Sequence, residues 1–268
     1  MAKPDARLAR LLLRLAPLSG LRRVPLLGDL LSKISHALVP SDALIWVRIQ
    51  HGPSQGLWLR VNPRTGQNVQ QGLGEPAVQK ALQEHLRPGM TFYDLGANIG
   101  FFTLLAARLV EPGGRVVSFE ADPEIAARLR ENVRRNNFAN VTVEQKAIWS
   151  QPGTVSFARV ASTDSPDRGL GHVSSGIEVR NTISVEATTL DHYIYTLGHP
   201  APDLLKCDVE GAEVEVFAGT KRLLQTKRVI LLIEMHSPEN HELLTHSLRS
   251  LNYDCSSLDE SHVLALPR

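Results

Sequence analysis

Cysteine is scarce in this chain, and its scarcity excludes two classes of protein. Only Cys207 and Cys255 occur among the 268 residues. Two cysteines cannot build the disulfide framework of a small secreted domain, and no CxxC or Cys/His spacing indicates a structural metal site. A reducing, cytoplasmic setting is therefore predicted.

An excess of charge of one sign is also missing. The formal net charge is +1, whereas dedicated nucleic-acid-binding proteins usually carry a strong basic excess. Nucleic acid is therefore not an expected partner. With 43% apolar residues, the chain is long enough for one sizeable core with an added arm.

The N-terminal stretch "ARLARLLLRLAPLSG" lacks a long uninterrupted apolar run, because Arg7, Arg10 and Arg14 divide it. A signal peptide needs a continuous apolar run, and a transmembrane helix needs ~20 mostly apolar residues. The spacing instead predicts a basic amphipathic helix, followed by a second helix punctuated by proline and glycine. Two roles stay open: an arm that packs its leucines on the main domain, or contact with a membrane surface or lipid-linked substrate.

The segment after this arm contains signals for a β-hairpin and a helix. Residues 43–61 form two alternating runs around a turn at 51–54, which predicts a hairpin. A helix is expected to begin at Pro76 and to stop at Gly89. We therefore expect residues 1–72 to form a helical arm with a hairpin, and residues 73–268 to form the main domain.

In the main domain, strand patterns alternate with helix patterns. "MTFYDLG", "RVVSFE", "DLLKCDVE" and "RVILLIEMH" predict strands, each followed by a helical segment. The second of these helices has Asp122 at its N-cap and Pro123 at its first position. Such alternation predicts parallel βαβ units and an α/β fold with a doubly wound sheet.

Three further segments of the main domain carry specific expectations. Residues 212–225 have the pattern of one continuous helix, and the C-terminal segment predicts two strands around a turn at 259–260. Residues 161–176 are polar and rich in glycine, which predicts a mobile loop.

The stretch "DLGANIG" predicts a strand that turns at glycines into a helix, a turn that presents free backbone N–H groups to a ligand. A nucleoside-triphosphate loop ends in Gly-Lys-Ser/Thr, but Phe101 follows the last glycine here. A dinucleotide fingerprint needs a second glycine where this chain has Asn98. Both of these phosphate ligands are therefore disfavoured.

Two acidic residues favour a third ligand. Asp94 at the end of the first strand would repel a pyrophosphate but suits a positively charged group with an amine. Glu120 ends the next strand, twenty residues beyond Gly100, where an acid takes ribose hydroxyls. With Gly96 and Asn98, these residues fit S-adenosyl-L-methionine better than either rival.

The chain resembles the FkbM family of S-adenosylmethionine-dependent methyltransferases, through "TFYDLGANIGFFTLLAA", "VTVEQKAIWS", "LLKCDVEGAEVEVFAGTKRLL" and "ILLIEMH". The resemblance runs from about residue 74 to residue 236. It implies a seven-stranded class I methyltransferase (Rossmann-like) sheet with a reversed last strand. It also implies methyl transfer, usually to oxygen, on small hydroxylated acceptors such as polyketides, sugars and glycolipids.

The same resemblance implies a set of cofactor-binding residues. The glycine motif and Glu120 would hold the cofactor, the residues after the second and third strands would line its adenine, and an upstream glutamate would reach it. One departure is "ADP" at 121–123, where the family often has Pro-x-Pro. The implied residues are Glu75, Asp94, Gly96, Asn98, Gly100, Glu120, Ala121, Asp122, Lys146, Ala147, Ile148 and Asp208.

Methylation of a hydroxyl also needs a base, and three candidates lie at the ends of neighbouring strands: Asp208, Glu210 and His236. Each has an alternative: Asp208 contacts only the cofactor amine, Glu210 braces the next helix through its backbone N–H groups, or His236 is an ordinary loop residue. Lys206 is expected to pair with a nearby carboxylate.

Other chemistries find less support. Asp208, Glu234 and His236 could supply donors for Mg²⁺, but no tight ligand spacing supports a metal, and none is expected. No Gly-x-Ser-x-Gly elbow indicates a hydrolase. "DVEG" replaces the Asn/Asp-Pro-Pro-Tyr/Phe motif of many amino-methyltransferases, so N-methylation is the weaker alternative, beside a membrane-associated, cofactor-binding scaffold. The arm, the hairpin and residues 161–176 are expected to build the acceptor site.

Overall fold

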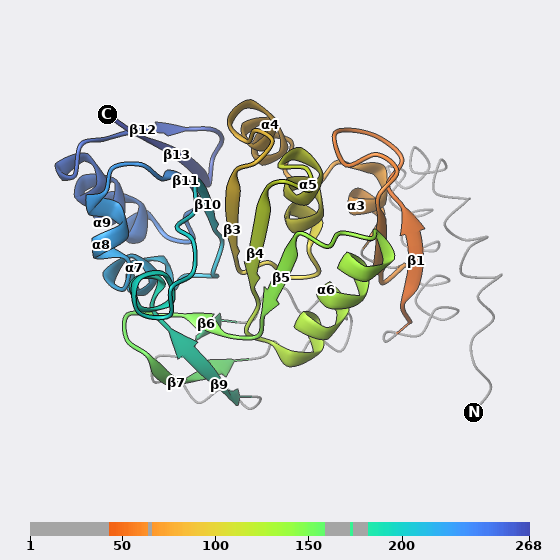
Figure 1. Ribbon diagram of the computed structural model, residues 1–268, viewed down its shortest axis with the longest axis horizontal. Helices are drawn as coiled ribbons and strands as arrows, with labels where there is room; N and C mark the ends of the chain where they lie inside the picture. Colours follow the sequence, from red (N-terminus) through yellow and green to blue (C-terminus); the bar gives the residue numbers. More distant parts are fainter. Residues whose placement is uncertain (1–42, 64–65, 159–171, 174–181) are drawn as a thin grey trace, which may run out of the picture. The chain divides into compact units, whose positions relative to one another are not determined.

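A computed structural model describes residues 43–63, 66–158, 172–173 and 182–268 (Figure 1). These residues fall into two compact units that divide between Gly74 and Glu75. The predicted N-terminal arm and most of the predicted loop at 161–176 lie outside the described residues. The domain division at 72/73 stays a prediction. Within the described ranges, no helix is both long and apolar enough to cross a membrane.

The first unit contains the predicted hairpin. Strands β1 (Ile45–Arg48) and β2 (Trp58–Val61) pair antiparallel, with Ile45 opposite Val61. Their inward side chains, among them Val47 and Leu59, are buried, as the alternating pattern predicts. Helix α3 (Gln67–Gln71) follows, and the carbonyl of Gln70 accepts the Gln50 N–H at 2.8 Å.

The second unit is built on a seven-stranded sheet of order β12-β13-β11-β10-β3-β4-β5. The five neighbouring strands β11, β10, β3, β4 and β5 run parallel to one another, and β13 runs antiparallel to β11. The expected doubly wound α/β sheet with a reversed last strand is therefore confirmed. The strands are β3 (Thr91–Leu95), β4 (Arg115–Phe119), β5 (Val141–Glu144), β10 (Leu204–Cys207), β11 (Ile230–Glu234), β12 (Tyr253–Ser257) and β13 (His262–Pro267).

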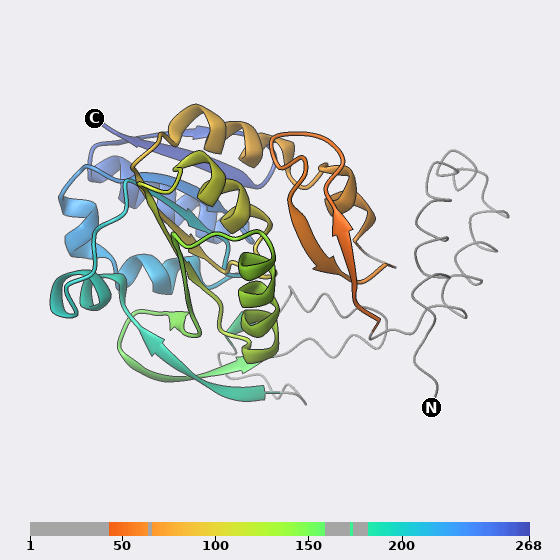
Figure 2. The same cartoon turned by 45° about the vertical axis from the view of Figure 1, so that its right-hand side comes forward.

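Helices cover both faces of this sheet (Figures 1 and 2). On one face α5 (Phe101–Leu109) packs on β3 and β4, α6 (Pro123–Arg135) packs on β5, and α4 (Pro76–His85) contacts α5. The other face forms a buried cluster with α7 (Glu213–Ala218), α8 (Lys221–Gln225), α9 (Pro238–Ser250) and the π-helical turn His192–Thr196. Strand side chains alternate between these faces, so Tyr93 faces the second set of helices and Asp94 faces α5.

The helix boundaries agree in part with the predictions. Asp122 caps α6 by accepting the backbone N–H groups of Glu124 and Ile125, as predicted. Helix α4 begins at Pro76 but ends at His85, before the predicted stop at Gly89. The reason is Pro88, which disfavours helical geometry at the residue before it.

The prediction of one helix over 212–225 is wrong, because α7 and α8 are separate. A Cβ at Gly219, between them, would lie 2.3 Å from the Trp149 carbonyl oxygen, so the chain passes close to that carbonyl. The carboxylate of Asp191 then accepts the Arg222 and Leu223 N–H groups at 2.8 and 2.9 Å. This distant acid provides hydrogen-bond acceptors for a second helix start.

A small second sheet has the order β6-β9-β7-β8. Its strands are β6 (Ala147–Ile148), β7 (Gly153–Ala158), β8 (His172–Val173) and β9 (Thr182–Thr188). Strand β8 falls inside the segment predicted as a mobile loop, and for these two residues the prediction is wrong. The reason is that β7 would otherwise be an edge strand on the side away from β9. Its backbone groups on that side instead pair antiparallel with β8.

Candidate functional site

The glycine turn joins β3 directly to α5, as predicted, but its backbone N–H groups are not free. Those of Gly96 and Ala97 donate to the Phe119 carbonyl at 3.0 Å, and that of Gly100 donates to the Ala97 carbonyl. The Asn98 N–H donates to Oε2 of Glu120, and the Ile99 N–H to Oδ1 of Asn98. The expectation of free donors is therefore wrong: each of these five N–H groups has an acceptor within the protein, and none is left unpaired to bind a phosphate.

The close approach of the Asp208 backbone requires a glycine at position 96. Its φ is +74°, in the left-handed region, and a Cβ there would lie 1.7 Å from the backbone oxygen of Asp208. Asn98 (φ +50°) and Gly100 (φ +91°) also lie in the left-handed region. The turn thus packs directly against the end of β10, where the candidate catalytic residues begin.

Glu120 holds the turn and the next helix together. Its Oε2 accepts the Asn98 N–H and its Oε1 accepts the Asp122 N–H, both at 2.8 Å. Burial raises the pKa of Glu120 to about 7, although these two hydrogen bonds act to lower it. Each carboxylate oxygen has more than one acceptor site, so the side chain retains capacity for two ligand hydroxyls.

Asp94 and Lys206 are buried neighbours on adjacent strands that end at the turn. They are register partners on β3 and β10, and both are at most 2% exposed. Oδ2 of Asp94 accepts from the Thr103 hydroxyl at 2.6 Å, whereas Oδ1 has no hydrogen-bond partner among the described residues. Burial raises the pKa of Asp94, and the ammonium of Lys206 acts against this rise.

The predicted pairing of Lys206 with a carboxylate is confirmed. Its Nζ lies 2.8 Å from Oδ2 of Asp208 and 4.9 Å from the centroid of the Phe102 ring. Burial acts to lower the pKa of Lys206, but the carboxylates of Asp208 and Asp94 outweigh it and the pKa is raised. One oxygen of Asp208 is therefore already engaged.

The structure brings the three candidate bases together. Nε2 of His236 lies 3.3 Å from Oε2 of Glu210 and 3.8 Å from Oδ1 of Asp208. Burial and the charge of Asp208 raise the pKa of Glu210 to about 7. The hydrogen bond with Glu213 is the main cause that raises the pKa of His236 to about 9. His236 is thus cationic at neutral pH in this arrangement.

Glu213 is a residue of this group that sequence reasoning missed. It is fully buried and accepts from Nδ1 of His236 at 2.7 Å, from Nδ2 of Asn240 at 2.6 Å, and from the Gly211 N–H at 2.9 Å. Burial acts to raise the pKa of Glu213, but these hydrogen bonds, that of His236 first, lower it. Glu213 thus links Gly211, just before α7, to His236 and to Asn240 on α9. The signal was the third acid in "DVEGAE".

The residues expected near an adenine are distributed over three places. Ala121 and Ala147 pack in one small apolar cluster, but Ile148 belongs to the main core. Nζ of Lys146 lies 2.6 Å from Oε1 of Glu186 on β9. Of these residues, Ala121 and Ala147 share an apolar cluster, and the contact with an adenine stays a prediction.

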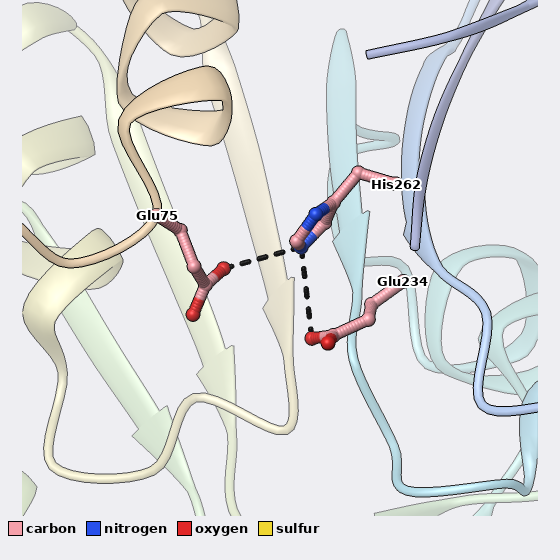
Figure 3. Close-up of side chains that lie close together, drawn as sticks. All are labelled: Glu75, Glu234 and His262. Atoms are coloured by element: carbon pink, nitrogen blue, oxygen red, sulfur yellow. Dashed lines mark ion pairs between the residues drawn. The ribbon is translucent and has the colours of Figure 1, made fainter. Parts of the chain in front are cut away.

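Glu75 lies at the N-cap of α4 with φ +42° and makes no capping hydrogen bond with its own helix. Its Oε2 instead lies 3.2 Å from Nε2 of His262, which also lies 3.6 Å from Oε2 of Glu234 (Figure 3). Burial acts to lower the pKa of His262, but Glu234, Glu75 and Asp259 together raise it to about 10. His262 was missed in the sequence because no short spacing links it to these acids.

The strand ends carry more acid than base. The charged side chains of this region interact electrostatically with one another. A carboxylate oxygen of Glu234, one of Asp208 and a ring nitrogen of His236 lie within 4.8 Å of one another. The carboxylates are Glu75, Asp94, Asp208, Glu210, Glu213 and Glu234, and the cationic groups are Lys206, His236 and His262. Such an excess of acid favours a positively charged ligand.

Known proteins resemble this chain over more than half of its length. The 31-O-demethyl-FK506 methyltransferase FkbM of Streptomyces tacrolimicus is 33% identical, over 51% of this chain and 61% of that protein. The 2-O-methyltransferase NoeI of Sinorhizobium fredii is 31% identical, over 54% of this chain and 63% of that protein. The hexuronic acid methyltransferase AglP of Haloferax volcanii is 25% identical, over 61% and 63%.

Each of these alignments spans less than two thirds of the relative's own length. The family described as the methyltransferase FkbM domain matches residues 94–255, from the end of β3 to β12. This range contains the glycine turn, Glu120 and the three candidate bases. The chain therefore belongs to the FkbM methyltransferase family.

Proposed function

We propose that this protein is an S-adenosylmethionine-dependent O-methyltransferase that acts on a hydroxyl of a small molecule, of the sugar, polyketide or glycolipid type. The observation that carries the proposal is the Glu120 carboxylate, held at the glycine turn by the Asn98 and Asp122 N–H groups. In a chain of the FkbM family, this arrangement fits a ribose rather than a phosphate.

The residues around the turn fit the cofactor's groups. Glu120 would accept the two ribose hydroxyls, and the acid-rich strand ends would favour a sulfonium with its ammonium group. Oδ1 of Asp94 is buried without a hydrogen-bond partner in the described part of the chain, so it offers an acceptor for the amine. Ala121 and Ala147 would supply an apolar contact for the adenine. When bound, the cofactor supplies an activated methyl group.

The expected acceptor class has independent support. The three relatives carry names that specify a 31-O-methylation, a 2-O-methylation and a hexuronic acid acceptor. Two of these names specify a methyl group on oxygen. The parts expected to shape the acceptor pocket, the arm and residues 161–176, fall mainly outside the described residues, so we propose the chemical class alone.

The geometry supports a division of work among the candidate bases. Glu210, with a pKa of about 7, is suited to accept the hydroxyl proton, since a base works best with a pKa near the operating pH. His236, cationic and anchored by Glu213, would orient the Glu210 carboxylate through Nε2–H. Asp208 would neutralise Lys206 and complete the negative strand end.

Calorimetry with S-adenosylmethionine, NAD and ATP tests the cofactor assignment. We expect binding of S-adenosylmethionine alone, and formation of S-adenosylhomocysteine with a panel of hydroxylated sugars and polyketides. Tight binding of NAD or ATP with indifference to S-adenosylmethionine would contradict the proposal. Binding without turnover on any hydroxylated acceptor would favour the scaffold role instead.

A further inference from the structure

Three side chains from distant parts of the chain converge at one point of the second unit (Figure 3). Glu234 and His262 are direct partners across the antiparallel β11–β13 pair, so their side chains share one face of the sheet. Glu75 reaches the same point from the N-cap of α4. One ligand atom of each lies within 4.8 Å of the others.

His262 is oriented as a metal-binding histidine is. Its side chain is 5% exposed, and Nδ1 lies 2.8 Å from Oδ1 of Asp259. A carboxylate on one ring nitrogen fixes the ring and directs the other nitrogen outward, which is the usual arrangement behind a metal ligand. Nε2 has no hydrogen-bond partner among the described residues, and neither does Oε2 of Glu75, which it faces.

The spacing of these atoms suits a small dication. Nitrogen and oxygen ligands at ~2.1 Å from a metal lie about 3.0–3.4 Å from one another in octahedral or tetrahedral geometry. Nε2 of His262 lies 3.2 Å from Oε2 of Glu75 and 3.6 Å from Oε2 of Glu234. The two carboxylates would also balance the charge of a divalent cation, whereas a proton on Nε2 balances only one of them.

The neighbouring group of Asp208, Glu234 and His236 is a weaker candidate. Both ring nitrogens of His236 already face carboxylates, Nδ1 that of Glu213 and Nε2 that of Glu210. The His236 side chain is also 22% exposed, against 5% for His262, so its ring is less firmly enclosed. His262 differs because its Nε2 is a buried atom without a hydrogen-bond partner among the described residues, and it faces two carboxylates from separate elements.

We propose that Glu75, Glu234 and His262 bind one divalent transition-metal cation of the Zn²⁺ or Mn²⁺ type. One imidazole with two carboxylates suits these metals better than Ca²⁺, which takes oxygen ligands alone. The side chains of Glu75 and Glu234 are 39% and 23% exposed, which leaves the cation a route from solvent. Three protein ligands leave a coordination position open for water.

The open position has a further consequence, which rests on the proposed function. Glu234 lies beside the group of candidate bases, so the cation would lower the pKa of an acceptor hydroxyl that reaches it. Binding of the cation itself requires no methyl transfer. It is therefore tested without the methyl donor, and its failure would leave the methyltransferase proposal intact.

The test is titration of the metal-free, full-length protein with Zn²⁺ by calorimetry, and with Co²⁺ by visible absorption. We expect one equivalent to bind, and His262→Gln and Glu75→Gln each to weaken binding at least tenfold. Asp259→Asn should weaken it about 10–100-fold, the usual effect of removing a partner of a metal-bound histidine. Thermal unfolding of each variant shows whether the fold is retained, and the partly exposed Glu75 provides a variant that leaves the buried histidine in place.

His246→Gln is the matched control, because His246 is exposed on α9, and its metal affinity should equal that of the wild type. Three results would overturn the site: no stoichiometric binding by the wild type, equal affinity of wild type and folded Glu75→Gln, or loss of binding in His236→Gln but not in His262→Gln. In the first case the three residues form an imidazolium ion pair only.

Discussion

The two sides of the candidate site are built in different ways. On the side of β3 and β4, the continuous glycine turn at 96–100 has an acceptor inside the protein for every backbone N–H, and Glu120 provides one of these acceptors. On the side of β10, β11 and β13, charged groups from distant segments face one another with acid in excess. Both sides contain carboxyl groups with raised pKa values, but the second also sets acids against histidines, an arrangement suited to proton transfer, whereas the first is suited to hold a ligand rigidly.

The largest expected effect comes from breaking the contact that joins the two sides. Gly96→Ala places a Cβ 1.7 Å from the Asp208 backbone oxygen at a positive φ, so the turn or the end of β10 must move. We expect a loss of ~3 kcal/mol in the free energy of unfolding, with loss of turnover, measured by denaturant titration and activity. Gly113→Ala is the control: nothing lies within 4 Å of its Cβ, and a change below ~0.5 kcal/mol is expected. Equal stability of both variants would contradict the close packing.

The next largest effect separates the chemistry from cofactor binding. Glu210→Gln removes the proposed base, so kcat should fall by about 10²-fold or more while the affinity for S-adenosylmethionine changes little. Single-turnover kinetics and calorimetry measure the two quantities. Glu239→Gln, an exposed acid in the first turn of α9, should change neither. If Glu210→Gln retains its kcat and His236→Gln does not, the base is the histidine and the proposed division of work is wrong.

The same contrast explains how far the sequence could be interpreted. The turn from Asp94 to Gly100 is continuous, and Glu120 ends the next strand, so spacing alone predicted that these residues meet. The reversed last strand followed from the family resemblance and is confirmed by the pairing of β13 with β11. Local features such as the glycine turn can be predicted from the sequence because residues that are close together in the chain determine them.

The charged side could be predicted only in part. Asp208, Glu210 and His236 were predicted at strand ends and meet there, but their hydrogen-bond partner Glu213 was missed. His262 was missed because its approach to Glu75 depends on the strand order, which no local pattern encodes. For the same reason the break between α7 and α8 was not predicted, since Asp191 caps α8 from a distant segment.

A smaller effect tests the side that holds the ligand. Glu120→Gln retains the shape of the side chain but loses the charge and one acceptor oxygen, so one backbone N–H loses its partner. A charged hydrogen bond contributes about 1.5–3 kcal/mol, so we expect a roughly 10–100-fold rise in the dissociation constant of S-adenosylmethionine. Glu124→Gln, exposed on α6, is the control and should bind as the wild type does. An unchanged dissociation constant in Glu120→Gln would contradict the ribose assignment.

The smallest effect is the pH dependence of the same group. Burial raises the pKa of Glu120 to about 7 in the free protein, so the carboxylate that accepts ribose hydroxyls is largely protonated at pH 6. The affinity for S-adenosylmethionine should therefore fall up to about tenfold between pH 8 and pH 6.

Stability should change in the opposite sense: the folded-state pKa lies above the unfolded value of 4.5, so the contribution of Glu120 to stability is present below pH 4.5 and is lost as the pH rises through 7. Calorimetric titrations at several pH values measure the first trend, and denaturant titrations measure the second. In Glu120→Gln the affinity trend should disappear and the stability trend should weaken, because Glu210, whose pKa is also raised to about 7, retains its own contribution. An unchanged affinity trend in this variant would assign it to a group on the charged side.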